Sequence, residues 1–408
     1  MEKLKKYVDL MVNVGVNIQL GQKLMIQCPV DLAYIARMAM EAAYKAGAAD
    51  VMITWGDELS SRINYLMAPD SNFGNEVEWV KARVKHLVDE GYNLLSIYAT
   101  DPENLKGVDP ERIQKEVRVN SIMRKPLSDA VSSSAIQWTL ASVPIPSWAV
   151  KVFPNAKSED EAVELMWDAI FKASRIDDND PVENWKKHVD TLQSKAQAMN
   201  DYNFKSLIFK NAKGTNLDLG LPCGHIWVAC GEKAGTGVNF IANIPTEEVF
   251  TAPDRNRING IVYSTKPLVY MGDVIDEFWL RVEAGKVVEY DAKQNKHLLE
   301  KLLTTHEGAD YFGEVALVPH SSPISQSGIL WFNTLYDENA SCHLALGRAY
   351  PTTVKGTEGK NDEELNKMGV NTSMAHEDFM MGSEDMDIIG ITQDDKEVQV
   401  FKAGEWAI

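Results

Sequence analysis

The sequence is short of the features that mark several large classes of protein. Its four cysteines, Cys28, Cys223, Cys230 and Cys342, are too few and too irregularly spaced among 408 residues for a disulfide framework. No window approaches the roughly 18 uninterrupted apolar residues of a membrane span. The N-terminus lacks the apolar segment and the small-residue cleavage site of a secretory signal. We therefore expect a cytoplasmic protein with reduced thiols that does not enter a membrane.

Positive charge is also scarce. The chain has 41 Lys and Arg residues against 59 Asp and Glu residues, which gives a formal net charge of −18. Nucleic acids and anionic membrane surfaces both select clustered Lys and Arg, so neither is expected as a partner. An acidic excess keeps soluble molecules apart by repulsion, and it is equally compatible with carboxylates gathered in a site for cations.

The N-terminal half lacks the glycine-rich turn of a nucleotide site, although its pattern is that of a parallel sheet. Strand-like and helical segments alternate at residues 23–28, 31–46, 50–55, 76–90 and 92–99. The turn after the first strand, residues 28–31, contains no glycine. We expect a Rossmann-like parallel sheet here, without support for phosphate binding.

The C-terminal half has a different texture. After about residue 205 glycines become frequent and strand-like segments short, and residues 278–282 and 286–290 flank Glu283-Ala284-Gly285 as a hairpin would. A helical pattern follows over residues 292–304. We therefore expect two domains, an α/β domain over residues 1–200 and an α+β, strand-rich domain over residues 201–408.

Two of the eight histidines have neighbours that suit a metal site. His343 follows Asp337 and Glu338 and is surrounded by small residues, which would let an ion approach closely. His376 and Asp378 would share one face of an extended segment. A single His-x-Asp pair is a weak signal, and a structural role for either histidine is the simpler alternative.

Carboxylates at the heads of apolar strands add to this pattern. Glu247 and Glu248 precede Val249, and Glu314 opens the apolar segment 315–318. Burying an acid is costly unless it binds a metal or pairs with a cation, although each acid alone has a structural explanation. Two histidines with several carboxylates suit zinc, cobalt, manganese or magnesium.

Three segments, residues 246–253, 337–347 and 376–383, resemble peptidase family M29 in order and spacing. These thermophilic-type aminopeptidases include aminopeptidases T and S and PepS. The resemblance implies a metal-dependent aminopeptidase that hydrolyses the N-terminal peptide bond of short peptides. It also implies two divalent ions in the catalytic C-terminal domain, and a homodimer that encloses its active sites.

The resemblance also implies a set of metal ligands. They would be Glu248, Glu314, Glu338, His343, His376 and Asp378. Glu314 would bridge the ions, with Glu248, His376 and Asp378 around one ion and Glu338 and His343 around the other. Glu377 departs from the expected pattern, in which an apolar residue separates the histidine from the aspartate.

Roles for two further residues follow from this chemistry. Two metals would polarise the scissile carbonyl and lower the pKa of a bridging water. Tyr350, seven residues after His343, resembles the family's active-site tyrosine and would donate a hydrogen bond to the oxyanion. Glu247 would shuttle a proton or support the ligands from behind. The alternatives are a non-catalytic peptide- or metal-binding protein on the same scaffold, or another metal-dependent amidohydrolase. The presence of all six proposed ligands favours the peptidase.

Overall fold

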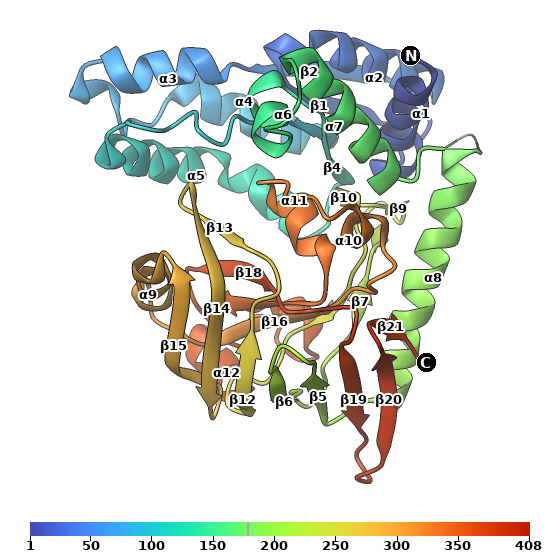
Figure 1. Ribbon diagram of the computed structural model, residues 1–408. Coiled ribbons are helices and arrows are strands. Elements are labelled where there is room, and N and C mark those ends of the chain that lie inside the picture. The colour runs from blue at the N-terminus through green and yellow to red at the C-terminus, as the bar shows by residue number, and fades with distance from the viewer. Residues whose placement is uncertain (178) are drawn as a thin grey trace. The chain divides into compact units, whose positions relative to one another are not determined.

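The chain divides into two compact units in a computed structural model that describes residues 1–177 and 179–408 (Figure 1). The first unit comprises residues 1–187 and 231–245, and the second comprises residues 188–230 and 246–408. The division falls inside helix α8 (Pro181–Tyr202), after Lys187. The segment 231–245 returns to the first unit because its strand β10 (Asn243–Ile244) hydrogen-bonds to that unit's sheet.

The first unit is built on the expected parallel sheet. Its strand order is β10-β4-β3-β1-β2, and every neighbouring pair is parallel. The other strands are β1 (Lys23–Pro29), β2 (Asp50–Gly56), β3 (Tyr92–Tyr98) and β4 (Trp138–Ser142). Leu24, Met25 and Ile26 are consecutive and all buried in β1. Both faces of this strand are therefore covered, as is usual in a parallel sheet.

Helices precede the first strand of this sheet and connect the later ones. They are α1 (Glu2–Leu10), α2 (Ala33–Lys45), α3 (Glu58–Met67), α4 (Glu78–Asp89), α5 (Pro110–Ser132), α6 (Pro146–Val152) and α7 (Glu159–Ala173). A small antiparallel pair, β8 (Glu232–Lys233) and β9 (Asn239–Phe240), completes the unit. Among the described residues, no helix is both long enough and apolar enough to span a bilayer.

The second unit is strand-rich, as expected, and contains two antiparallel sheets. The larger has the order β13-β14-β12-β6-β5-β19-β20-β21, with β15 on β14, and the smaller has the order β18-β17-β16-β11-β7. The strands of the larger sheet are β5 (Ser206–Lys210), β6 (Asn216–Gly220), β12 (Ile258–Tyr263), β13 (Leu268–Tyr270), β14 (Asp273–Glu283), β15 (Lys286–Gln294), β19 (Asp387–Ile391), β20 (Glu397–Lys402) and β21 (Glu405–Trp406). Those of the smaller sheet are β7 (Val228–Ala229), β11 (Val249–Thr251), β16 (Phe312–Leu317), β17 (His343–Gly347) and β18 (His376–Met380).

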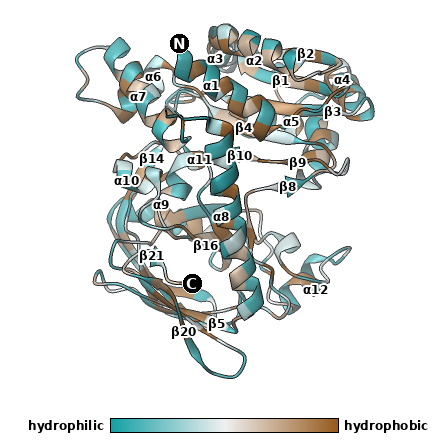
Figure 2. Ribbon diagram, turned by 90° about the vertical axis from the view of Figure 1, so that its right-hand side faces the viewer, coloured by the Kyte–Doolittle hydropathy of each residue, from teal (hydrophilic) through white to brown (hydrophobic). Residues whose placement is uncertain are grey.

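Helices α8, α9 (Lys296–Thr304), α10 (Pro323–Ser327), α11 (Thr334–Asp337) and α12 (Asp362–Lys367) accompany these sheets. Hydrophilic and hydrophobic segments alternate along α8 in Figure 2, and Leu192, Ala196 and Met199 from this helix are buried in the core. The hairpin of β14 and β15 confirms the one expected around Glu283-Ala284-Gly285. The following helix begins at Lys296 instead of residue 292, because β15 continues to Gln294.

The smaller sheet of the second unit, the five-stranded sheet β18-β17-β16-β11-β7, packs one face against the apolar core. Val315, Leu344 and Phe379 lie side by side on β16, β17 and β18 and are buried in the main apolar cluster. Phe379 contacts Phe278 of the nine-stranded sheet, with ring centroids 5.4 Å apart. Since side chains alternate along each strand, the residues next to this apolar row point to the opposite face.

The turn of the β14–β15 hairpin depends on a glycine. Gly285 has φ +84°, and a Cβ there would lie 1.5 Å from the carbonyl oxygen of Arg255. Gly272 has the same φ, but a Cβ at that position would have nothing within 4 Å. The two glycines thus share a backbone conformation and differ in the space around it.

We predict that Gly285→Ala destabilises the protein more than Gly272→Ala does. Both substitutions place a Cβ on a residue with positive φ, which destabilises the folded protein by about 1–2 kcal/mol. Only Gly285→Ala also meets the Arg255 carbonyl, which adds at least about 1 kcal/mol of overpacking. Denaturant unfolding of both variants measures the difference, and equal midpoints would contradict the steric explanation.

Candidate metal centre

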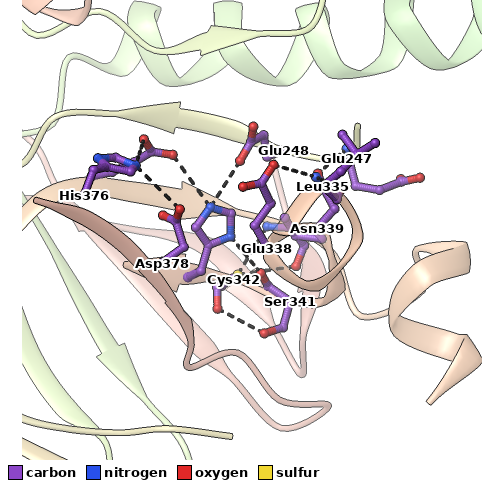
Figure 3. A network of polar contacts seen from close by, with 12 residues as sticks. Glu247, Glu248, Leu335, Glu338, Asn339, Ser341, Cys342, His376 and Asp378 are labelled. Carbon is purple, nitrogen blue, oxygen red and sulfur yellow. Dashed lines mark hydrogen bonds and ion pairs between the residues drawn. The ribbon is translucent and has the colours of Figure 1, made fainter. Parts of the chain in front are cut away.

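Acidic and histidine side chains converge on the smaller sheet of the second unit, on the face that points away from the apolar core (Figure 3). Ligand atoms of Glu248, Glu314 and His343 all lie within 4.8 Å of one another. Ligand atoms of Glu314, His376 and Asp378 do so as well. Glu314 is therefore common to two groups, and five of the six residues expected as ligands lie in one cluster.

The strand register explains this convergence. Glu314 lies opposite Ala345, and Ala345 lies opposite Asp378, so the three residues form one row across β16, β17 and β18. His343 and His376 are each two positions from this row along their own strands, which puts them on the same face. Ala345 carries only a methyl group, so it leaves space above the middle of the row.

Glu248 reaches the cluster from a different strand. It directly precedes β11, which pairs with β16 and lies on the far side of that strand from β18. Its Oε2 is 3.2 Å from Nε2 of His343. We expected Glu248 beside His376, but the strand order brings it to His343 instead.

Glu338 adjoins the cluster from outside the sheet. It begins a 3-10 turn (Glu338–Ala340) directly after α11. Burial, together with the negative charges of Glu248 and Asp378, raises its pKa well above the ordinary value. The sixth expected ligand is thus close enough to share the electrostatics of the cluster, although it belongs to neither group of three.

Both histidines are oriented by backbone carbonyls. Nδ1 of His343 is 3.2 Å from the carbonyl oxygen of Ser341, and Nδ1 of His376 is 2.7 Å from that of Arg348. A carbonyl only accepts hydrogen bonds, so each Nδ1 carries the proton and donates. In the neutral rings Nε2 then keeps a free lone pair, the arrangement typical of metal-binding histidines.

The two Nε2 atoms face opposite oxygens of Glu314. Nε2 of His343 is 3.6 Å from Oε1, and Nε2 of His376 is 3.8 Å from Oε2. Nε2 of His376 is also 3.5 Å from Oδ2 of Asp378. The carboxylate of Glu314 therefore lies between two imidazoles that backbone carbonyls hold in place.

Charge repulsion within the cluster is strong. Burial, reinforced by the charges of Asp378 and Glu248, raises the pKa of Glu314 to about 7. Burial lowers the pKa of His343, but the hydrogen-bonded carboxylates of Glu248 and Glu314 outweigh it and raise that pKa well above its usual range. Buried carboxylates at this density need positive charge to remain ionised.

One oxygen in the cluster is left without a partner. Oδ1 of Asp378 is buried, and within residues 1–177 and 179–408 it has no hydrogen-bond partner. Burial raises the pKa of Asp378, but the His376 hydrogen bond and the charge of His343 lower it overall. An ionised, buried oxygen without a donor suits a cation. The donor set, with anchored imidazoles and buried carboxylates, therefore fits divalent metal ions.

Tyr350 lies at the open edge of the cluster. Its ring centroid is 5.1 Å from that of His376, and 49% of the residue is exposed. Burial, with the charges of Glu314 and Asp378, raises the pKa of its hydroxyl. The hydroxyl therefore stays protonated and able to donate a hydrogen bond.

Glu247 is not part of the cluster. It is buried, and its Oε2 is 3.9 Å from Nε2 of His188. Its backbone N–H donates to Oδ1 of Asn339, at 2.7 Å. This hydrogen bond ties the start of β11 to the turn that carries Glu338, a structural contact that the sequence did not indicate.

Glu377 also lies outside both groups of three. Alternation along β18 turns it away from His376 and Asp378, as the sequence pattern suggested. Burial, with the negative charge of Asp378, raises its pKa to about 7.

The chain has relatives along its whole length. A family model described as thermophilic metalloprotease (M29) matches residues 1–406. Aminopeptidase PepS of Streptococcus thermophilus is 42% identical, with 100% of this chain and 98% of the relative covered. Aminopeptidase T of Thermus aquaticus is 36% identical, with 100% and 99% covered. The solved structure of wild-type AmpT from Thermus thermophilus is similar with a TM-score of 0.92 at 34% identity, covering 100% of this chain and 99% of that one.

We predict that Glu314→Gln removes more than half of the bound metal, because this carboxylate is shared by both groups of three and the amide lacks its charge. Glu300→Gln, on the exposed side of α9, is the matched control and should keep the full content. Elemental analysis after dialysis against a divalent salt measures both variants. Unchanged metal content in Glu314→Gln would contradict a shared ligand.

Proposed function

Because the chain belongs to the thermophilic metalloprotease family M29, we propose that it is an aminopeptidase that releases N-terminal residues from short peptides with two divalent cations. The family makes it a metal-dependent peptidase. The observation that carries the two-ion proposal is the position of Glu314 between two groups, each with one anchored histidine. Zinc, cobalt, manganese and magnesium all suit this donor set.

The distances suggest how the ligands divide. One ion would be held by Glu248, Glu314 and His343, with Glu338 completing its surroundings. The other would be held by Glu314, His376 and Asp378, whose unpartnered Oδ1 supplies a further donor. This assignment moves Glu248 to the ion of His343, and leaves Glu314 as the bridge.

The surrounding residues supply the remaining chemistry. When bound, the cations would polarise the scissile carbonyl and lower the pKa of an attacking water. Tyr350, protonated and beside His376, would donate a hydrogen bond to the oxyanion that develops on the carbonyl oxygen. The acidic surroundings favour the cationic α-amine of a free N-terminus, which accounts for exopeptidase action. For Glu247, contacts with His188 and Asn339 favour the supporting role over proton transfer.

The alternatives differ in how they use this cluster. A binding protein without catalysis would not need Tyr350 beside the ligands, and all six expected ligand residues are present here. Another amidohydrolase would accept substrates without a free α-amine. A homodimer with enclosed active sites and a cytoplasmic location stay predictions from the family resemblance and the composition.

An assay with aminoacyl chromogenic substrates tests the function. We predict that the metal-loaded protein releases the chromophore from substrates with a free α-amine and not from their N-acetylated counterparts. Exhaustive chelation should abolish turnover, and added cobalt, manganese or zinc should restore it to different extents. Full activity in metal-free protein would exclude the metal mechanism, and equal cleavage of acetylated substrates would exclude an aminopeptidase.

Tyr350 offers a test of the oxyanion role. We predict that Tyr350→Phe lowers kcat by about 10²–10³, the usual cost of removing one oxyanion donor, and leaves metal content unchanged. His376→Ala should instead lose metal together with activity, because it removes a ligand. Measuring kcat and metal content on both variants separates the two roles. A near-normal kcat in Tyr350→Phe would make Tyr350 a packing residue, with the metal assignment unaffected.

A further inference from the structure

A pocket in the second unit opens directly beside the candidate metal centre. Glu338 and Asp378 line it, so the pocket and the metal centre share a wall. Much of its remaining wall is apolar and includes Leu268, Val269 and Met380. A side chain attached next to a peptide bond at the metal centre could therefore extend along an apolar surface.

Two further acids, Asp337 and Glu377, line this pocket, and only the carboxylate of Asp337 has hydrogen-bond partners. The carboxylate of Asp337 accepts hydrogen bonds from the backbone N–H groups of Trp331 and Asn333, at 2.8 and 2.9 Å, and interacts with the charge of Lys266. The side-chain carboxylate of Glu377, in contrast, has no hydrogen bond or ion pair within the described ranges 1–177 and 179–408. A partly buried carboxylate without a partner is costly, and a cation brought by a ligand would remove that cost.

The position of Glu377 indicates whether its partner would be the substrate's α-amine or a basic side chain of the substrate. The α-amine of a substrate is two bonds from the scissile carbonyl, so it must stay near the atoms of His376 and Asp378 that face the metal centre. Glu377 lies between these two residues in sequence, and alternation along β18 turns it to the other side. The α-amine therefore cannot reach Glu377. A long basic side chain can, because its methylene stem covers apolar surface while its charged head extends to the carboxylate.

We propose that this pocket receives the side chain of the substrate's first residue, and that Glu377 selects arginine or lysine there. Leu268, Val269 and Met380 would contact the methylene stem, and Glu377 would accept hydrogen bonds from the guanidinium or ammonium group. The inference rests on the proposed aminopeptidase function and names the substrate class of the same site. It also gives a role to the acid that departs from the expected apolar residue at this position.

Citrulline provides the direct test, because it has nearly the shape of arginine without the charge. We predict that the cobalt-loaded wild-type protein has a kcat/KM for an arginyl chromogenic substrate at least about tenfold above that for the citrullinyl one, as expected for a charge-assisted hydrogen bond. Equal values would overturn the role of Glu377. Wild-type protein without activity on any aminoacyl substrate would instead contradict the proposed function itself.

A variant then ties the preference to one carboxylate. Glu377→Gln should bring the arginyl-to-citrullinyl ratio close to one while metal content is retained. Glu397→Gln, at the exposed first residue of β20, is the matched control and should keep the wild-type ratio. An unchanged ratio in Glu377→Gln would overturn the proposal. So would an equal loss on arginyl, citrullinyl and leucyl substrates, because a carboxylate that binds the α-amine would affect all three alike.

Discussion

Repulsion among carboxylates is the constraint on which the second unit depends. Glu248, Glu314, Glu338 and Asp378 approach one another in a largely buried place, and two of them have strongly raised pKa values. Burial lowers the pKa values of His343 and His376, but the carboxylates around them outweigh it, so both imidazoles are protonated without metal and offset part of this charge. Two divalent cations would bring four positive charges to four carboxylates. Metal ions would displace the Nε2 protons and complete the neutralisation of the cluster, so stability should be linked to metal occupancy.

The sheet provides the stiffness that such crowding needs. Glu314 and His343 lie on β16 and β17, which are inner strands, and the reverse face of these strands is fixed by the main apolar core. Side chains anchored on packed strands are held more precisely than side chains on loops. The small Ala345, between Glu314 and Asp378, keeps the space over the sheet open. Apolar packing on the reverse face thus offsets the repulsion of a ligand geometry that the side chains alone would not adopt.

Much of this could be predicted from the sequence, and the exceptions have physical causes. The parallel strands of the first unit and the hairpin around Gly285 follow from local periodicity and turn chemistry. Helix α5 carries many charges and gives only a weak apolar pattern, so it did not stand out. The return of β10 to the first sheet, and the closeness of Glu248 to His343, are set by long-range strand pairing. The carbonyls that orient the histidines belong to the backbone, so the residue types at those positions do not reveal them.

Adjacent acids explain why the ligand set was recognisable while the roles of its neighbours were not. The pairs Glu247–Glu248, Asp337–Glu338 and Glu377–Asp378 each contain one acid beside the metal cluster and one that is turned elsewhere. Within β18 consecutive residues cannot share a face, so Glu377 and Asp378 point to opposite sides. Asp337 and Glu338 are separated instead where α11 ends and the 3-10 turn begins. The sequence shows two adjacent acids in each pair, and only the local backbone geometry distinguishes their positions. The other acids are then available for other tasks: Asp337 accepts hydrogen bonds from backbone N–H groups of its own loop, and Glu377 lines the pocket beside the candidate metal centre. Under the proposed function, catalysis and substrate choice would therefore depend on different residues and could change independently, although the two residues are adjacent in the chain.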